Sequence, residues 1–478
     1  MSTSRTLLFL LLVLGISSCV DERVVFRDRD LLVDLPAGAQ GFVGYTNVTA
    51  GITVCGNCHV TQQNQWSQTA HASAFAGAGA ATQPLCATCH GVSSSGNNAT
   101  VQGGLPATGD VRFRDVQCES CHGPGLDHVR NPDGGTATQM LARVNAMLGA
   151  NGTCTECHSG FHHPYVAEWQ SSGHGQVIAA PAGRADCSGC HEAKAALRAF
   201  GVLSEYRDQD DPTLMAITCA VCHDPHRATH QGQLRYSINV PDEQQNLCMR
   251  CHNKRGGPDF TAANRGPHSP EGPMLLGEAG WWPPNMPLDP GDRIVTTHGS
   301  VANPRMCAGC HMQQVQIADG APGGLAMGSS SHFFEAIPCL DAQGRPIGRG
   351  TCGLSQRTFR TCTGSGCHGS ENAARSAMST VRLRLDFWNG QLKAQLAQVP
   401  AAEFNPNDNR YSTAEGARFN SQLADRSGSV AHNPFLMEAL LIGSIQQVQR
   451  DYGVSPSTSA AELDGNMQRV LSLARQAM

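Results

Sequence analysis

The sequence C-x-x-C-H occurs eight times in this chain of 478 residues, and no other feature constrains the fold as strongly. Two thiols at this spacing can bond to the two vinyl groups of one porphyrin, and the histidine that follows is then held beneath the iron as its proximal ligand. Zinc sites and disulfides, the alternatives for so many cysteines, do not need a histidine after every second cysteine. The motifs therefore predict eight covalently bound haems c, held by Cys55, Cys58 and His59; Cys86, Cys89 and His90; Cys118, Cys121 and His122; Cys154, Cys157 and His158; Cys187, Cys190 and His191; Cys219, Cys222 and His223; Cys248, Cys251 and His252; and Cys307, Cys310 and His311.

A ninth site is predicted near residue 362. Setting aside Cys19 and the sixteen motif cysteines leaves Cys339, Cys352, Cys362 and Cys367. These four cysteines could form two disulfides, or one disulfide and one further haem attachment. His368 follows Cys367 directly, and the glycines of the insert at 363–366 allow a bulge at little steric cost. We therefore expect a stretched C-x4-C-H site that brings the total to about nine haems, and a Cys339–Cys352 disulfide.

The motifs belong to a duplicated unit. The first, second and third motifs recur in order as the fourth, fifth and sixth, so that two three-haem units lie head to tail, at residues 55–128 and 154–230. The flanking residues repeat as well, because Trp66 and His71 in WSQTAH match Trp169 and His174 in WQSSGH.

Histidines outside the motifs are candidates for the second axial ligand of each iron. Nine are needed, and the chain has eleven. The sequence does not assign a histidine to a particular haem, and it leaves the choice between His226 and His230 open, with His162 or His163 as a further source of one ligand. The expected distal ligands are His71, His128, His174, His226, His230, His268, His298, His332 and His432.

Composition predicts a mainly α fold with extensive irregular loops, organised around the haems. Aromatic residues make up only 5%, while 52 glycines and 26 prolines favour turns. We predict helices at 137–148, 433–452 and 459–477, a helical stripe from Met378 to Leu396, and packing of Trp281 and Trp282 against haem. The expected regions are 1–18 (lipoprotein signal peptide), 19–50 (tether), 51–253 (seven haems), 254–306 (Pro/Gly-rich loop), 307–369 (haems eight and nine) and 370–478 (helical module).

The N-terminal sequence predicts export and a lipid anchor. Arg5 precedes a short apolar run from Leu7 to Ile16, and ISSC ending at Cys19 is similar to a bacterial lipobox. We expect an outer-membrane lipoprotein, tethered to the membrane at Cys19 and facing the periplasm or the cell surface. A net charge of −5 argues against nucleic acid as a partner.

Several segments resemble known multihaem c-type cytochromes. The stretch from Cys55 through QWSQTAHASAF to CESCHGPGLDH resembles the tetrahaem cytochromes that accept electrons from hydroxylamine oxidoreductase. CAVCHDPH and NLCMRCHN are similar to segments of the outer-surface cytochromes of metal-reducing bacteria. CAGCHM, SHFF and HNPFLMEALL resemble C-terminal parts of multihaem nitrite-reductase relatives. The resemblance implies membership of the multihaem c-type cytochrome family.

Two functions are compatible with these features. Irons with two histidine ligands have no free position for substrate, which favours respiratory or extracellular electron transfer to partner cytochromes or an extracellular metal or mineral. The alternative is an oxidoreductase that reduces a nitrogen or sulfur oxyanion, such as nitrite, hydroxylamine or tetrathionate, at one open haem. The C-x-x-C-K motif that often marks such a haem in nitrite reductases is not found in this sequence. The sequence therefore favours an electron carrier and identifies no catalytic residue.

Overall fold

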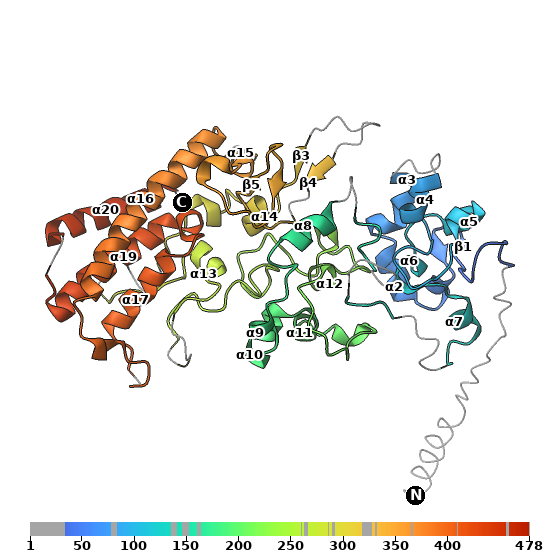
Figure 1. Cartoon of the computed structure of the whole chain (residues 1–478), viewed down its shortest axis with the longest axis horizontal. Helices are drawn as coiled ribbons and strands as arrows, with labels where there is room; N and C mark the ends of the chain where they lie inside the picture. The colour runs from blue at the N-terminus through green and yellow to red at the C-terminus, as the bar shows by residue number, and fades with distance from the viewer. Residues whose placement is uncertain are drawn as a thin grey trace, which may run out of the picture.

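The computed structural model shows an elongated chain whose two ends differ in architecture (Figure 1). Short helices and loops form the N-terminal end and the middle, and long helices form the C-terminal end. The predicted mainly helical fold with many loops is confirmed. The structure describes residues 34–77, 84–134, 141–145, 153–159, 164–259, 261, 266–284, 286–288, 292–317, 327–329, 332–364, 367–408, 410–455 and 458–477.

Strands are few and short among the described residues. They form three separate antiparallel pairs, in which Tyr45 faces Thr53, Gln316 faces Gly328 and Cys339 faces Ile347. The pairs are β1 (Tyr45–Asn47) with β2 (Ile52–Thr53), β3 (Val315–Ile317) with β4 (Met327–Ser329), and β5 (Cys339–Leu340) with β6 (Pro346–Ile347).

Most helices before residue 370 are one or two turns long, as expected where glycine and proline are frequent. Several of them contain the cysteine motifs, so the motifs themselves supply much of the helical structure. The α-helices are α2 (Val60–Trp66), α3 (Ala74–Gly77), α4 (Pro84–His90), α5 (Leu105–Thr108), α6 (Glu119–His122), α7 (Leu126–Arg130), α8 (Tyr165–Ser171), α9 (Ala179–Ala182), α10 (Ala185–His191), α11 (Ala193–Ala199), α12 (Cys219–Cys222), α13 (Glu271–Leu275), α14 (Met306–His311) and α15 (Arg360–Thr363). The 3₁₀ helices among the described residues are η1 (Cys55–Asn57), η2 (Ala70–Ser73), η4 (Val111–Phe113), η6 (Leu203–Glu205), η7 (Gln231–Gln233), η8 (Thr297–Gly299), η9 (Leu354–Gln356) and η10 (Ala401–Phe404).

The helix predicted at 137–148 is wrong for residues 141–145, which are irregular. The backbone N–H groups of Val144 and Asn145 donate to the carboxylate of Asp208 at 2.7 and 2.9 Å. The Asp208 side chain therefore replaces the carbonyl acceptors that a helix would provide. The remaining residues of that prediction lie outside the described part of the chain.

The C-terminal end is a helical module with a conventional apolar core. The helices predicted at 433–452 and 459–477 are present, and the predicted stripe lies on a long helix in which Leu385, Trp388 and Leu392 are buried. Ser412 and Glu415 form a capping box at a helix that the sequence analysis did not identify. The module consists of α16 (Glu371–Leu396), α17 (Thr413–Ala424), α18 (Ser429–His432), α19 (Pro434–Tyr452) and α20 (Ala460–Ala477).

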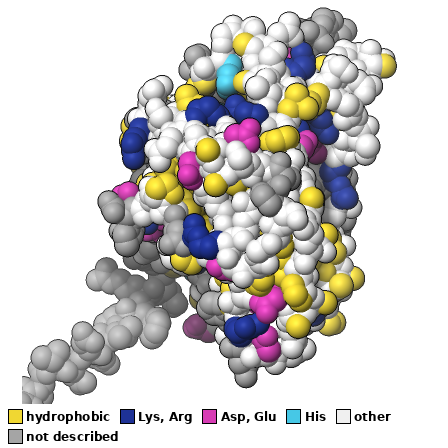
Figure 2. Space-filling view, turned by 90° about the vertical axis from the view of Figure 1, so that its left-hand side faces the viewer, with side chains coloured by type: hydrophobic (Ala, Val, Ile, Leu, Met, Phe, Trp, Pro, Cys, Tyr) yellow, Lys and Arg dark blue, Asp and Glu magenta, His cyan; other side chains and the backbone are white. Residues whose placement is uncertain are grey.

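The largest apolar cluster of the described residues belongs to this module, and the clusters in the motif-rich part are smaller. Figure 2 shows the end of the molecule that the module forms, where basic, acidic and hydrophobic side chains are interspersed. Among the described residues, no helix combines the length and the hydropathy that crossing a membrane requires.

Trp281 and Trp282 do not pack where the sequence analysis placed them. Both contact the apolar core of the helical module, and neither lines the cavity that contains the cysteine motifs. The backbone N–H of Trp281 donates to Asn420 Oδ1 at 2.8 Å, and Asn420 Nδ2 donates back to the Trp281 carbonyl at 2.7 Å. These bonds fix the loop that precedes the Cys307 motif to α17.

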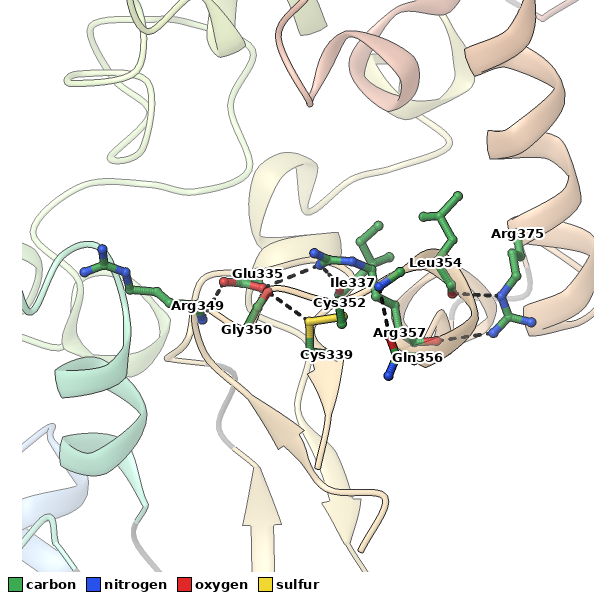
Figure 3. Close-up of a disulfide and its surroundings, with 11 residues drawn as sticks. Glu335, Ile337, Cys339, Arg349, Gly350, Cys352, Leu354, Gln356, Arg357 and Arg375 are labelled. Carbon is green, nitrogen blue, oxygen red and sulfur yellow. Dashed lines mark hydrogen bonds and ion pairs between the residues drawn. A yellow bond between two sulfur atoms is a disulfide. The ribbon is translucent and has the colours of Figure 1, made fainter. Parts of the chain in front are cut away.

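The predicted disulfide between Cys339 and Cys352 is present (Figure 3). Polar contacts surround it: Glu335 accepts from the backbone N–H of Arg349 at 2.7 Å, and Arg357 donates to the Ile337 carbonyl at 2.8 Å. Arg375 of α16 donates to the Arg357 carbonyl at 3.2 Å. The disulfide segment is thereby joined to the helical module.

Candidate haem-binding sites

All nine predicted attachment motifs line one cavity of about 3270 Å³. We number the motifs sites 1 to 9 in chain order, so that site 1 contains His59 and site 9 contains His368. The cavity wall includes cysteine and proximal histidine side chains of every site. A shared apolar space bordered by these groups fits a set of closely placed porphyrins.

Six of the motifs are closed by a local backbone hydrogen bond. In five of the C-x-x-C-H sites the histidine N–H donates to the carbonyl of the first cysteine, which turns both thiols and the imidazole toward one side. The donors and acceptors are His59 and Cys55 (2.9 Å), His122 and Cys118 (2.9 Å), His158 and Cys154 (3.1 Å), His223 and Cys219 (2.8 Å), and His252 and Cys248 (3.0 Å).

The stretched motif at site 9 closes in the same way. The backbone N–H of His368 donates to the carbonyl of Cys362 at 3.2 Å, although two more residues separate them than in the other motifs. The first cysteine and the histidine of this motif therefore keep the relation found at the other sites.

Eight of the nine proximal histidines face a second histidine from another part of the chain. The ring centres of each pair are 6.0 to 6.3 Å apart. With metal–nitrogen bonds of about 2 Å on both sides, two imidazoles that share one metal ion have ring centres about 6 Å apart. The pairs are His59 with His128, His122 with His226, His158 with His71, His191 with His268, His223 with His332, His252 with His174, His311 with His432 and His368 with His298.

The structure distinguishes His226 from His230 as candidates for a distal ligand, a choice that the sequence left open. The His226 ring stacks over that of His122, whereas His230 begins the turn of η7 and does not line the cavity. At site 2, Nδ1 of His90 lies 2.9 Å from the Ala74 carbonyl. His162 and His163, the further candidates for a distal ligand, lie outside the described residues.

Matching hydrogen bonds anchor the tryptophans of the two predicted units. The indole N–H of Trp66 donates to the Val116 carbonyl at 2.9 Å, and that of Trp169 donates to the Ile217 carbonyl at 2.8 Å. Each tryptophan positions the histidine five residues later. His71 faces the proximal histidine of site 4 and His174 that of site 7, so that each unit supplies a histidine to the first site that follows it in the chain.

Cysteines of different sites also contact each other. Hydrogen bonds between thiols raise the pKa of one partner and lower that of the other, as at Cys89, whose pKa falls to about 7 beside Cys157. In the haem-bound protein these sulfur atoms are thioethers, so what matters here is their proximity. The contacts are Cys55 with Cys118, Cys154 with Cys219, Cys248 with Cys307, Cys89 with Cys157, and Cys190 with Cys251. Five pairs of sites are therefore neighbours: 1 and 3, 4 and 6, 7 and 8, 2 and 4, and 5 and 7.

Burial keeps several of the paired histidines neutral. Desolvation lowers the pKa of His174 and of His432 to about 4, and it also lowers the pKa of His71, His226 and His311. A neutral imidazole has a free lone pair, which is the form that binds a metal ion. The residues present thus fit a haem iron held between two histidines.

Two regions match known protein families. Residues 54–123, which contain sites 1 to 3, match the family of cytochrome c554 and c-prime. Residues 213–257, which contain sites 6 and 7, match the family described as the doubled CXXCH motif. No curated protein and no solved structure shows a significant match to the chain.

Proposed function

Since this chain is a multihaem c-type cytochrome that functions in electron transfer, we propose that it conducts electrons through nine haems whose irons each have two histidine ligands. The observation that carries the proposal is the set of eight histidine pairs with ring centres 6.0 to 6.3 Å apart. Haem supplies the one-electron chemistry, and an iron with six ligands exchanges electrons without binding substrate.

The contacts between sites support a main path with two branches. Sulfur contacts link site 1 to site 3, site 4 to site 6, and site 7 to site 8. Three further pairs of cysteines are close enough for the charge of one to shift the pKa of the other: Cys121 and Cys154, Cys222 and Cys248, and Cys362 and Cys310. These pairs link site 3 to site 4, site 6 to site 7, and site 9 to site 8. Electrons would pass along sites 1, 3, 4, 6, 7, 8 and 9, with site 2 beside site 4 and site 5 beside site 7.

The two ends of this path are open to partners. Cys58 of site 1 and Cys367 of site 9 are exposed, and the other sixteen motif cysteines are partly covered. These ends belong to the N-terminal part and to the region beside the helical module, which lie far apart along the molecule (Figure 1). We propose that redox partner proteins exchange electrons at one end and that a second cytochrome or an extracellular metal or mineral does so at the other.

The proposed location is the outer membrane, with attachment through a lipid on Cys19 and the protein facing the periplasm or the cell surface. The proposal rests on the N-terminal sequence, since residues 1–33 lie outside the described part. Lipid attachment at one end of the chain would keep the path close to the membrane while leaving site 9 available to partners.

Low-temperature EPR of the purified, oxidised protein with and without nitrite or hydroxylamine tests this function. We expect low-spin signals that neither ligand changes, because the proposal gives every iron two histidine ligands. A high-spin signal that moves on adding either compound would instead favour the oxidoreductase. Intact mass is the companion measurement, and it should exceed that of the processed chain by nine haems.

A further inference from the structure

Site 7 differs from several other sites in what its proximal histidine contacts. Nδ1 of His252 lies 3.4 Å from Oε2 of Glu271, so a carboxylate faces the ring nitrogen opposite the iron-binding one. At three other sites the corresponding nitrogen faces a neutral backbone carbonyl. These contacts join His90 to Ala74 (2.9 Å), His223 to Gly232 (2.6 Å) and His311 to Phe334 (2.8 Å).

The backbone holds Glu271 beside His252. Glu271 is the first residue of α13, and the N–H of the next residue, Gly272, donates to the His252 carbonyl at 2.8 Å. A Cβ atom at Gly272 would lie 3.0 Å from the same carbonyl oxygen, so glycine permits this close approach. Both Glu271 and His252 line the cavity. The backbone thus places Glu271 next to His252, within reach of its ring.

We propose that Glu271 sets the reduction potential of the haem at site 7 and makes it lower than a neutral partner would. This inference rests on the proposed function. A carboxylate that accepts the Nδ1–H of a ligating histidine makes the imidazole a stronger electron donor to the metal. Reduction adds one electron to Fe(III) and gives Fe(II), with no proton required. The carboxylate favours the more positive Fe(III) state, and the electron is therefore held less tightly at this site.

The position of site 7 gives this effect a consequence. Its cysteines contact those of site 5 and site 8, and Cys222 of site 6 acts on the pKa of Cys248. On the proposed path, electrons that pass between the duplicated units and the two C-terminal sites cross site 7. Because its reduction potential is lowered, site 7 is an energetically unfavourable position for an electron between two groups of haems. The height of this barrier controls how fast electrons pass from one group to the other.

The direct test replaces the charge and keeps the shape. In Glu271→Gln the amide can still accept a hydrogen bond, while Glu271→Asp retains the negative charge. Glu278→Gln is the matched control, because Glu278 lies shortly after the same helix and pairs with Arg293 at 2.5 Å. Each holoprotein is titrated potentiometrically with the haem absorbance as the signal, and its haem content is checked by intact mass.

We expect one ninth of the absorbance change to move to a higher potential in Glu271→Gln, with a smaller shift in Glu271→Asp and none in Glu278→Gln. One low-spin EPR signal should change with it. A titration identical to that of the wild type would overturn the inference. Equal shifts of two haems would also overturn it, because they would indicate a field acting on sites 7 and 8 without the contact. If Glu271→Gln loses haem, Glu271→Ala, which also removes the charge, takes its place, and an unmoved curve there rejects the inference.

The proposed function is tested separately from the role of Glu271, because its test uses the EPR spectrum and the intact mass of the wild-type protein. A wild type with nine low-spin haems together with unmoved variants would remove the role of Glu271 alone.

Discussion

The backbone N–H of His368 donates to the carbonyl of Cys362 at 3.2 Å, which closes the longest cysteine motif of the chain as the shorter ones are closed. Its imidazole faces His298 with ring centres 6.3 Å apart. The two cysteines are thus in the setting of a haem site, and the disulfide of this region joins the other two, Cys339 and Cys352.

The first prediction concerns this ninth site. The double variant Cys362→Ala/Cys367→Ala should lose one haem, because both thioether bonds of site 9 disappear. Cys352→Ala, which opens the disulfide, is the control and should keep the wild-type number. Intact mass distinguishes the cases, and a double variant that loses only the mass of its two sulfur atoms would remove site 9 from the haem count.

A second prediction uses two histidines four positions apart. His226→Ala should open the iron of site 3, since the His226 ring is 6.0 Å from that of His122 and nearly parallel to it. A new high-spin EPR signal from one haem is expected. His230→Ala should leave the spectrum low-spin, because His230 does not line the cavity. The reverse result would show that His230 is the ligand.

The third prediction concerns the buried carboxylate that joins three helices of the module. Glu438 of α19 is fully buried and pairs with Arg384 of α16 at 3.3 Å and with Arg469 of α20 at 2.6 Å. Both arginines are about a third exposed, so solvent screens them, and Glu438→Ala should cost about 2 kcal/mol of unfolding free energy.

Urea unfolding followed by far-UV circular dichroism measures this effect. Asp386→Asn is the control, because Asp386 is exposed and pairs with Arg382 only at 3.8 Å. Its cost should stay below about 0.5 kcal/mol. Equal effects of the two substitutions would mean that the buried network does not stabilise the module.

The fourth prediction concerns the membrane anchor. Cys19→Ala removes the thiol that would carry the lipid, and the protein should move from the membrane fraction to the soluble fraction. Ser17→Ala changes the same segment and should keep the protein on the membrane. Retention of the Cys19→Ala variant in the membrane fraction would contradict the lipoprotein assignment.

The sequence predicted the positions of the attachment motifs because the chemistry is local, with two thiols and an imidazole within a few residues. It also predicted α16, α19 and α20, whose apolar residues recur with the helical period. The segment at 141–145 has a helical pattern as well, but Asp208, which is distant in the sequence, takes its N–H groups.

Partners across the molecule could not be read from the sequence. His226 and His230 both follow site 6 closely, and their difference arises from the turn in which Asp224 accepts the N–H of His226 at 3.0 Å. Trp281 resembled a haem contact in composition alone, yet Asn420 of α17 binds its backbone. Such choices depend on which segments meet in the folded chain.

The pairing of histidines across the units also bears on biosynthesis and damage. Site 3 faces His226 of the second unit, whereas site 4 faces His71 of the first. In the haem-bound protein, neither unit could be completed without the other, and a chain that ended after residue 253 would lack the partners His268 and His332 of sites 5 and 6. A proteolytic cut that freed one of these segments would leave an iron without its second histidine. The selective pressure on such a cytochrome therefore acts on the integrity of the whole chain.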